Sequence, residues 1–192
     1  MKKNAQTTLI HAPRKAPQSI STVQPPLFRA STIIFENTDA LFNRHWTDAY
    51  DYSYGTHGTP TTFTLGDNIA QIEGGEYCLL APSGLSAINL VNSCFLSQGD
   101  EVWVADNIYG PNMEHLRNLE TRYGIAVKVY NPLEVETFTP SEKAKLLWLE
   151  AAGSVTLEFP DLVGLIKKAQ AHHILTALDN TWGAGLAFNA FD

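Results

Sequence analysis

The sequence is poor in cysteine, in basic residues and in long hydrophobic runs, and each shortage excludes a class of protein. Only two cysteines occur among its 192 residues, Cys78 and Cys94, and both lie in apolar segments. They suit buried thiols better than a disulfide framework or a metal site. No apolar run is long enough to span a bilayer, and the basic N-terminal residues lack the apolar stretch of a signal peptide. We therefore expect a cytoplasmic protein with no membrane partner.

Basic residues are outnumbered and scattered. The sequence has 13 lysines and arginines against 20 acidic residues, for a net charge of −7. No basic stripe is present that could neutralise a run of phosphates, so we expect no nucleic-acid partner. A G-x-G-x-x-G fingerprint followed by an acidic residue is also missing, which ranks a nicotinamide or flavin dinucleotide oxidoreductase last among the candidate functions.

The length and composition fit one globular domain with an N-terminal extension. Hydrophobic residues make up 44% of the sequence and charged residues 17%, without a low-complexity tract. Residues 1–62 mix prolines with polar residues and end in an aromatic, glycine-bearing loop. We interpret them as an extended arm, of a kind that often lies on a partner subunit, followed by a loop. The domain proper is expected over residues 63–192.

Segments with helix and strand periodicity alternate along the chain. Helices are predicted over residues 37–45, 63–72, 84–96, 112–122 and 160–171. Strands are predicted over residues 77–81, 101–105, 126–130, 145–150 and 174–178. Such alternation is typical of an α/β fold in which a mainly parallel sheet carries helices on both faces. Because ligands bind these sheets outside the carboxyl ends of the strands, functional residues are expected in the loops there.

Three of these loops carry side chains suited to a planar cofactor with a phosphate group. Ser83, Gly84 and Leu85 lie between an apolar segment and a helix, where backbone N–H groups favour a phosphate; an ordinary helix N-cap is the alternative. Asp179 ends an apolar strand, and its carboxylate can pair with a protonated ring nitrogen, cap a helix or bind a metal. Tyr109 can stack on a planar ring or be a partly buried loop residue.

Longer stretches of the sequence carry a family resemblance through their order and spacing. They are YSYGTHGTPTTFTLGDNIAQIEGGEYCLLAPSGLSA, GDEVWVADNIYGPN, LWLEAAGSVTLEFPD and ALDNTWGAGLAFNAFD. Together they resemble the pyridoxal-phosphate-dependent transsulfuration enzymes, also called the Cys/Met metabolism family, from about Thr8 to the last residue. Residues 153–156 and 179–182 favour the cystathionine β-lyase branch. The resemblance implies the large domain of the aspartate-aminotransferase-like fold, fold type I, with pyridoxal 5'-phosphate as cofactor.

The resemblance also implies a role for each candidate residue. It places Ser83, Gly84 and Leu85 at the cofactor phosphate and Tyr109 on one face of the pyridine ring. Asp179 would pair with the ring nitrogen, and Thr181 would lie on the other face. No metal ligand is implied.

The loop around Tyr54 is implied to reach the phosphate of a neighbouring subunit. In the family an arginine commonly follows this tyrosine by two residues, but here that position is Thr56, followed by His57. His57 either substitutes for the arginine or is an exposed loop histidine. The family further implies a homo-oligomer, a tetramer built as a dimer of dimers.

A lysine that forms a Schiff base with the cofactor is expected to follow the aspartate by roughly two dozen residues in this family. Asp179 is followed by only thirteen residues, so we expect that lysine beyond Asp192, together with the family's small C-terminal domain. The chain then looks like a fragment that is inactive alone. The lysines that it does contain are Lys2, Lys3, Lys15, Lys128, Lys143, Lys145, Lys167 and Lys168.

For the complete enzyme the resemblance implies carbon–sulfur lyase chemistry. Cystathionine would be cleaved by β-elimination to homocysteine, pyruvate and ammonia, as part of methionine biosynthesis. Cystathionine γ-lyase, methionine γ-lyase and γ-synthase chemistry on related sulfur amino acids are the alternatives within the family. A non-catalytic remnant that binds the cofactor or pairs with an intact subunit is the alternative of another class.

Overall fold

The computed structural model of the chain describes residues 25–45, 51–188 and 190–191. The described chain forms two compact units. The first unit runs to Leu80 and includes Phe191, and the second comprises residues 81–190. The first part of the predicted arm, residues 1–24, lies outside the described residues.

The described part of the first unit contains two helices, α2 (Thr38–Phe42) and α3 (Pro60–Glu73). Asn37 caps α2, because its side-chain oxygen accepts a hydrogen bond from a backbone N–H of the first turn. Helix α3 begins three residues earlier than predicted, since Thr59 forms a capping box ahead of it. It ends at Gly74, whose φ of 78° is the left-handed conformation that glycine adopts without strain.

The second unit is built on one sheet of four parallel strands in the order β2-β1-β3-β4. The strands are β1 (Glu101–Ala105), β2 (Ala126–Tyr130), β3 (Ala144–Glu150) and β4 (Leu175–Asp179). All residues of β1 are buried, as expected for a central strand that is covered on both faces. The prediction of a mainly parallel sheet is confirmed.

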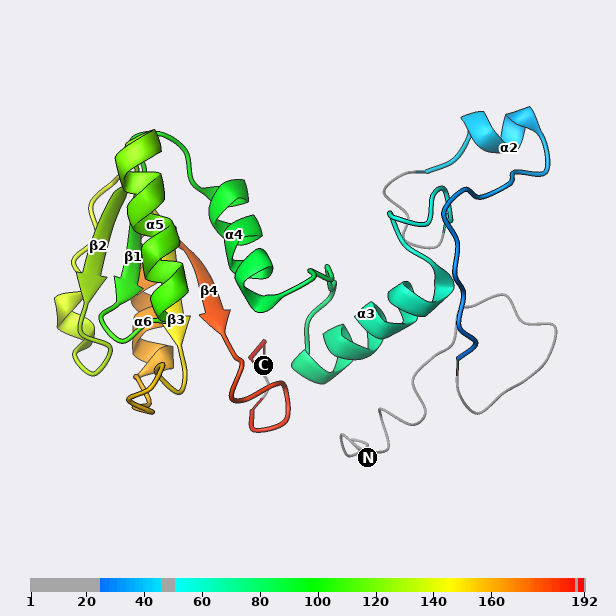
Figure 1. The fold of residues 1–192 in the computed structure, drawn as a ribbon. Coiled ribbons are helices and arrows are strands. Elements are labelled where there is room, and N and C mark those ends of the chain that lie inside the picture. Colours follow the sequence, from blue (N-terminus) through cyan, green and yellow to red (C-terminus); the bar gives the residue numbers. More distant parts are fainter. Residues whose placement is uncertain (1–24, 46–50, 189, 192) are drawn as a thin grey trace. The chain divides into compact units, whose positions relative to one another are not determined.

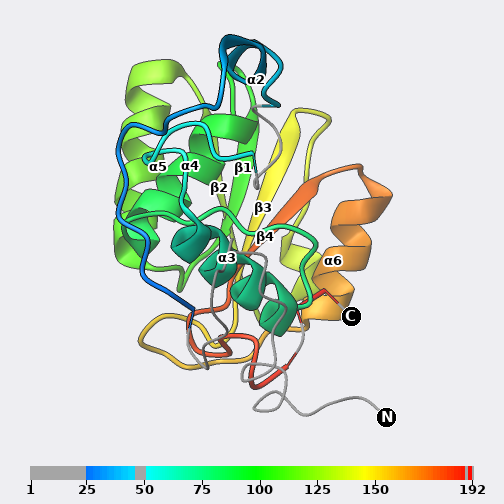
Figure 2. The same cartoon turned by 90° about the vertical axis from the view of Figure 1, so that its right-hand side faces the viewer.

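Helices cover both faces of this sheet, as predicted (Figure 1, Figure 2). Helices α4 (Gly84–Phe95) and α5 (Gly110–Tyr123) pack on one face, and α6 (Leu162–Ala171) packs on the other. A short 3₁₀ helix, η1 (Val135–Thr137), also lies on the α6 side. In the described ranges no helix has the length and apolar character needed to cross a bilayer.

Alternating side chains of the strands supply two separate hydrophobic cores. Val102 and Val104 of β1 point toward α4 and α5, whereas Trp103 and Ala105 point toward α6. The first core is completed by Ile88, Leu96, Ile108, Leu116, Ile125, Val127, Leu146 and Trp148. The second is completed by Tyr130, Phe138, Ala144, Leu147, Leu149, Leu165, Ala169 and Ile174. The strand sequences therefore read as continuous apolar runs.

The strand predicted over residues 77–81 is wrong. These residues run without regular structure between α3 and α4, and Tyr77 and Leu79 are 87% and 77% exposed. An apolar run becomes a strand only where a neighbouring strand pairs with its backbone. No segment of the described residues pairs with this one.

Other predictions differ from the structure in detail. Helix α6 begins at Leu162 rather than at residue 160, because Asp161 caps it by accepting a hydrogen bond from the backbone of its first turn. Helix α5 begins two residues earlier than predicted. Cys78 is partly buried and burial raises its thiol pKa, but Cys94 is exposed on α4, which corrects the expectation of two buried thiols. A helix position cannot be called buried from hydrophobic neighbours alone.

Removing a side chain from the second core should destabilise the chain strongly. Leu149 of β3 is 1% exposed, so Leu149→Ala should lower the free energy of unfolding by about 2 to 5 kcal/mol through lost contacts and the cavity left behind. Leu175 of β4 is 52% exposed, and Leu175→Ala is the matched control. Urea titrations of both variants test this, and equal losses would contradict the assignment of Leu149 to the core.

Candidate functional site

The candidate residues of the second unit lie where the strands end. Tyr109 follows β1, Asp179 is the last residue of β4, and Ser83 precedes α4. In Figure 1 the strand arrows point toward the ends at which α4 and α5 begin. The sheet therefore gathers the predicted phosphate loop, the tyrosine and the aspartate at one edge, as expected for parallel strands.

A buried glutamate, Glu150, connects the loops at this edge. It is the last residue of β3, is only 5% exposed, and its Oε2 atom accepts a hydrogen bond of 2.7 Å from the backbone N–H of Tyr109. In the register of the sheet Glu150 pairs with Asp179 of the neighbouring strand. The Tyr109 backbone and the two carboxylates are thus assembled by strand ends alone.

The environment of Glu150 disfavours its charged form. Burial raises the pKa of this carboxyl to about 7, and the negative charge of Asp179 acts in the same direction. The hydrogen bonds from the Tyr109 backbone and from the side chain of Ser154 act in the opposite direction. Two neighbouring carboxylates of this kind form a site that favours a cationic partner.

Asp179 is oriented by Thr181, the residue that the family resemblance assigns to the other face of the cofactor ring. Its Oδ1 atom accepts hydrogen bonds from the backbone N–H of Thr181, at 3.0 Å, and from the Thr181 hydroxyl, at 2.5 Å. The carboxylate is half-buried, and the Thr181 side chain is exposed. This Asx-type turn holds the carboxylate at the strand end.

Ser83 is the N-cap of α4, so the alternative of an ordinary helix N-cap is confirmed for this residue. Its Oγ atom accepts a hydrogen bond of 3.1 Å from the backbone N–H of Ser86. Ser83, Gly84 and Leu85 are all exposed, and a Cβ atom added to Gly84 would meet no atom within 4 Å. The start of α4 is therefore open to solvent, and an anion there would be stabilised by the helix N-terminus.

A loop after β3 is pinned to the loop after β1 through Asn107. The Asn107 side chain donates hydrogen bonds of 2.9 Å to Thr156 and to Glu158. Gly153 allows this close approach, because a Cβ atom there would lie 2.2 Å from the Asn107 amide nitrogen. In the same loop Val155 has a φ of 66°, a conformation that is strained for a β-branched residue. The loop is thus held beside Tyr109 despite local strain.

Tyr54 belongs to the first unit, whereas the other candidate residues belong to the second. Its hydroxyl accepts a hydrogen bond of 3.3 Å from Ser31, and its backbone forms an isolated antiparallel bridge with Thr32. The next residue, Gly55, donates its N–H to the Ser31 carbonyl oxygen at 2.7 Å. His57 packs against the ring of Phe63, with ring centres 5.9 Å apart. The expected contact of this loop with a phosphate stays a prediction.

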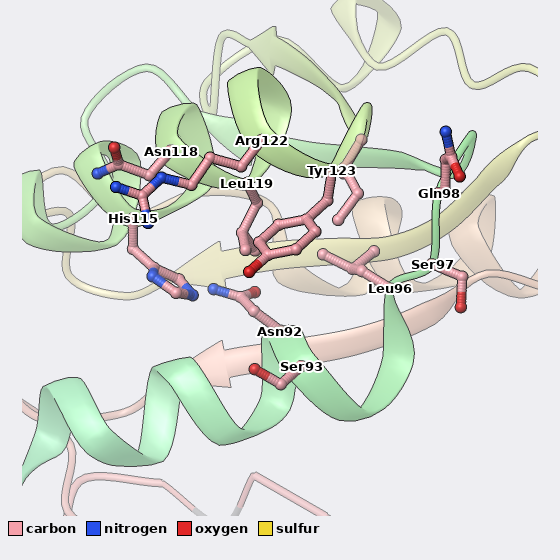
Figure 3. Close-up of a pocket in the computed structure, with 11 residues that line it drawn as sticks. Asn92, Ser93, Leu96, Ser97, Gln98, His115, Asn118, Leu119, Arg122 and Tyr123 are labelled. Carbon is pink, nitrogen blue, oxygen red and sulfur yellow. The ribbon is translucent and has the colours of Figure 1, made fainter.

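A groove of about 760 Å³ lies between the C-terminal parts of α4 and α5, at the opposite end of the strands (Figure 3). Its walls include Asn92, His115 and Tyr123. The Nε2 atom of His115 is buried and makes no hydrogen bond to the described residues, and burial lowers the pKa of this imidazole. None of the predicted cofactor residues lines the groove, so its size does not mark the site assembled at the strand ends.

Among the described residues, no three histidine, cysteine or acidic side chains are grouped so that they could hold a metal ion. The edge does fit a planar, phosphate-bearing cofactor. Its features are exposed N–H groups at Ser83, an exposed aromatic ring at Tyr109 and a carboxylate at Asp179.

Known proteins resemble this chain over most of its length. The chain is 32% identical to cystathionine beta-lyase of Haemophilus influenzae, over 97% of this chain and 48% of that protein. It is 31% identical to an L-alanine/L-glutamate racemase of Wolbachia pipientis, over 97% of this chain and 49% of that protein. The chain thus spans about half the length of these curated relatives.

Solved structures agree on the fold. Cystathionine gamma synthase from Xanthomonas oryzae, solved in complex with cystathionine, matches 94% of this chain and 45% of its own, with a TM-score of 0.79 and 25% identity. The solved structures that match this chain are pyridoxal-phosphate enzymes of fold type I, and the chain has the fold of this class. The profile of the family described as Cys/Met metabolism PLP-dependent enzyme matches residues 6–192, and the chain belongs to this family. The predicted cofactor, pyridoxal 5'-phosphate, is confirmed as that of the family.

Glu150 was not predicted as a site residue, although a signal for it exists. It ends the apolar run of β3 in the same way that Asp179 ends the apolar run of β4. A carboxylate at the end of a buried strand requires a partner, and that argument applies equally to both residues.

Glu150 should make the chain less stable as the pH rises through neutrality. The carboxyl has an ordinary pKa of 4.5 when unfolded and about 7 when folded, so between these values the folded state holds the extra proton. The free energy of unfolding should therefore fall between pH 5 and pH 8 by on the order of 1 to 2 kcal/mol, less than the full shift because water screens part of it. Urea titrations across this range measure the fall.

In the variant Glu150→Gln the side chain at this position cannot ionise, so the free energy of unfolding should not show the fall between pH 5 and pH 8. Glu158→Gln removes one negative charge from an exposed residue at the same edge and is the matched control, which should keep it. Identical pH profiles for wild type and Glu150→Gln would show that Glu150 does not titrate in this range.

Proposed function

We propose that this chain forms the cofactor-binding half of a cystathionine β-lyase, an enzyme that eliminates homocysteine from cystathionine. The observation that carries the cofactor part is the assembly of Ser83, Tyr109, Glu150 and Asp179 at one edge of the sheet. The substrate part is supported by relatives that carry the name cystathionine beta-lyase and are 28 to 35% identical.

Each residue at the edge has a task that its position permits. The N–H groups that follow Ser83 bind the phosphate, and the Tyr109 ring stacks on the cofactor ring. Asp179, held by Thr181, keeps the ring nitrogen protonated. When bound, the cofactor withdraws electrons and so stabilises negative charge at the substrate carbon that loses its proton.

Glu150 contributes to the same site by holding Tyr109. Its hydrogen bond to the Tyr109 backbone holds the residue at which α5 begins, and this residue carries the ring that can stack on the cofactor. Because Glu150 pairs with Asp179 in the sheet, the stacking residue and the carboxylate are set by one structural element.

The Schiff-base lysine and the small domain stay expectations from the family, and both would follow Asp192. The homo-oligomeric and cytoplasmic state of the whole protein is likewise proposed from the resemblance. Tyr54 would then act across a subunit interface. A non-catalytic remnant is the competing proposal for the chain on its own.

The charge of Asp179 should determine cofactor affinity. Asp179→Asn retains an oxygen that can accept the hydrogen bonds from Thr181 but removes the charge. The dissociation constant for pyridoxal 5'-phosphate should then rise roughly ten- to a hundredfold, the value of a charge-assisted hydrogen bond. Asp161→Asn removes a charge from the N-cap of α6 while retaining a capping side chain, and it should bind normally. Absorbance titration measures both, and equal affinities would refute the role of Asp179.

Product analysis tests the reaction itself. With cystathionine, the complete protein should release pyruvate, while the 192-residue chain alone should release none because the Schiff-base lysine is expected beyond Asp192. Formation of 2-oxobutanoate would assign γ-elimination instead. Racemised alanine without elimination would assign the activity named for the Wolbachia relative. Pyruvate release by the 192-residue chain alone would contradict the expectation that the Schiff-base lysine lies beyond Asp192.

A further inference from the structure

Three polar side chains form a chain of hydrogen bonds inside the hydrophobic core between α4, α5 and β3. Asn92 of α4 is 0% exposed, and Trp148 of β3 is 4% exposed. Asn112, in the first turn of α5, is also buried, at 1%. Figure 3 shows the Asn92 side chain projecting from α4 into the space beneath α5. Buried polar groups require mutual hydrogen bonds, and these three satisfy one another.

The direction of this network is set by its aromatic member. The Trp148 indole can only donate, and it donates to the Asn92 Oδ1 atom at 2.8 Å. The Asn92 Nδ2 atom must therefore point the other way, and it donates to the Asn112 Oδ1 atom at 3.1 Å. Asn92 thus accepts a hydrogen bond from a residue of β3 and donates one to a residue of α5. No apolar residue of similar size could make both connections.

The network closes a ring with the candidate site. Asn112 donates its backbone N–H to the Tyr109 carbonyl oxygen at 2.9 Å. Tyr109 in turn donates its N–H to Glu150, two residues after Trp148 on the same strand. The ring therefore runs from Tyr109 through Asn112, Asn92, Trp148 and Glu150 back to Tyr109. Its helix member, Asn92, lies on the same rigid helix that begins at the predicted phosphate loop.

Stability alone does not account for this arrangement. A well-packed apolar core would serve stability as well or better than a buried polar network, because polar groups lose water contacts on burial. What hydrogen bonds add is a fixed distance and orientation between the elements that they join. In this unit they join the helix of the phosphate loop to the helix of the stacking tyrosine.

We propose that Asn92 is a positioning residue that holds the phosphate-binding start of α4 at a fixed distance from Tyr109 and Glu150. The proposal rests on the proposed cofactor site. Asn92 acts through Trp148 and Asn112 and does not touch the cofactor. Loss of the network should therefore loosen the spacing of the site without removing any of its binding groups.

The test replaces the whole network with apolar side chains. In the triple variant Asn92→Leu, Asn112→Leu and Trp148→Phe no buried polar group is left unpaired, so the fold should persist. Its dissociation constant for pyridoxal 5'-phosphate should nevertheless rise about tenfold, the low end of what supporting residues contribute at metal sites. The visible circular dichroism of the bound cofactor, which reports the orientation of its ring, should also change. Asn118→Leu, an exposed asparagine of α5, is the control and should change neither.

The outcomes separate this proposal from the cofactor site on which it rests. A folded triple variant with wild-type affinity and dichroism overturns the positioning role. If the triple variant does not fold, Trp148→Phe alone, which removes only the donor, decides by the same readouts. If the wild-type protein does not bind the cofactor, the proposed function fails. Hydrogen exchange at the first turns of α4 and α5 then decides, since unchanged protection in the variant overturns the positioning role.

Discussion

The hydrogen bond between the Glu150 carboxylate and the Tyr109 backbone is the contact on which the rest of the site depends. It joins the end of β3 to the start of α5, and so converts the order of strands in the sheet into a position for one aromatic ring. Its acceptor, Glu150, is paired with Asp179 in the register of the sheet. The register of the strands therefore determines which side chains meet at this edge.

Two carboxylates at adjacent strand ends also explain why this edge suits a cation. Burial raises the pKa of Glu150, and the negative charge of Asp179 acts in the same direction. A protonated ring nitrogen beside Asp179 would relieve that repulsion, whereas the exposed N–H groups after Ser83 would stabilise an anion. The edge therefore presents a negative and a positive end, which matches a cofactor with a ring cation and a phosphate.

Most of the sheet and its helices could be predicted from the sequence because buried parallel strands read as apolar runs. Strands β1 and β2 were predicted with their observed bounds. Residues 77–81 have the same composition but no pairing partner, and pairing is a non-local property that no local pattern contains. Helices α3 and α6 begin at other residues than predicted because Thr59 and Asp161 act as N-caps, a signal that the sequence did contain.

Side chains that act through others were the harder part of the site to predict. Asp179 was identified because it ends a strand, and the same reasoning would have identified Glu150. Asn92 has no such signal, because an asparagine within a helix is usually exposed, and its burial follows from how α4 meets β3 and α5.

The roles proposed for Ser83, Tyr109 and Asp179 all concern the cofactor, and different reactions can share them. A lyase and a racemase both match nearly the whole chain at about one-third identity. An enzyme that protonates a stabilised carbanion and one that expels a thiolate from it need the same ring, the same phosphate site and the same carboxylate. Selection between them must come from groups that contact the substrate's side chain. The loop pinned by Asn107, with its strained Val155, is the described segment beside the site that the shared cofactor chemistry does not explain.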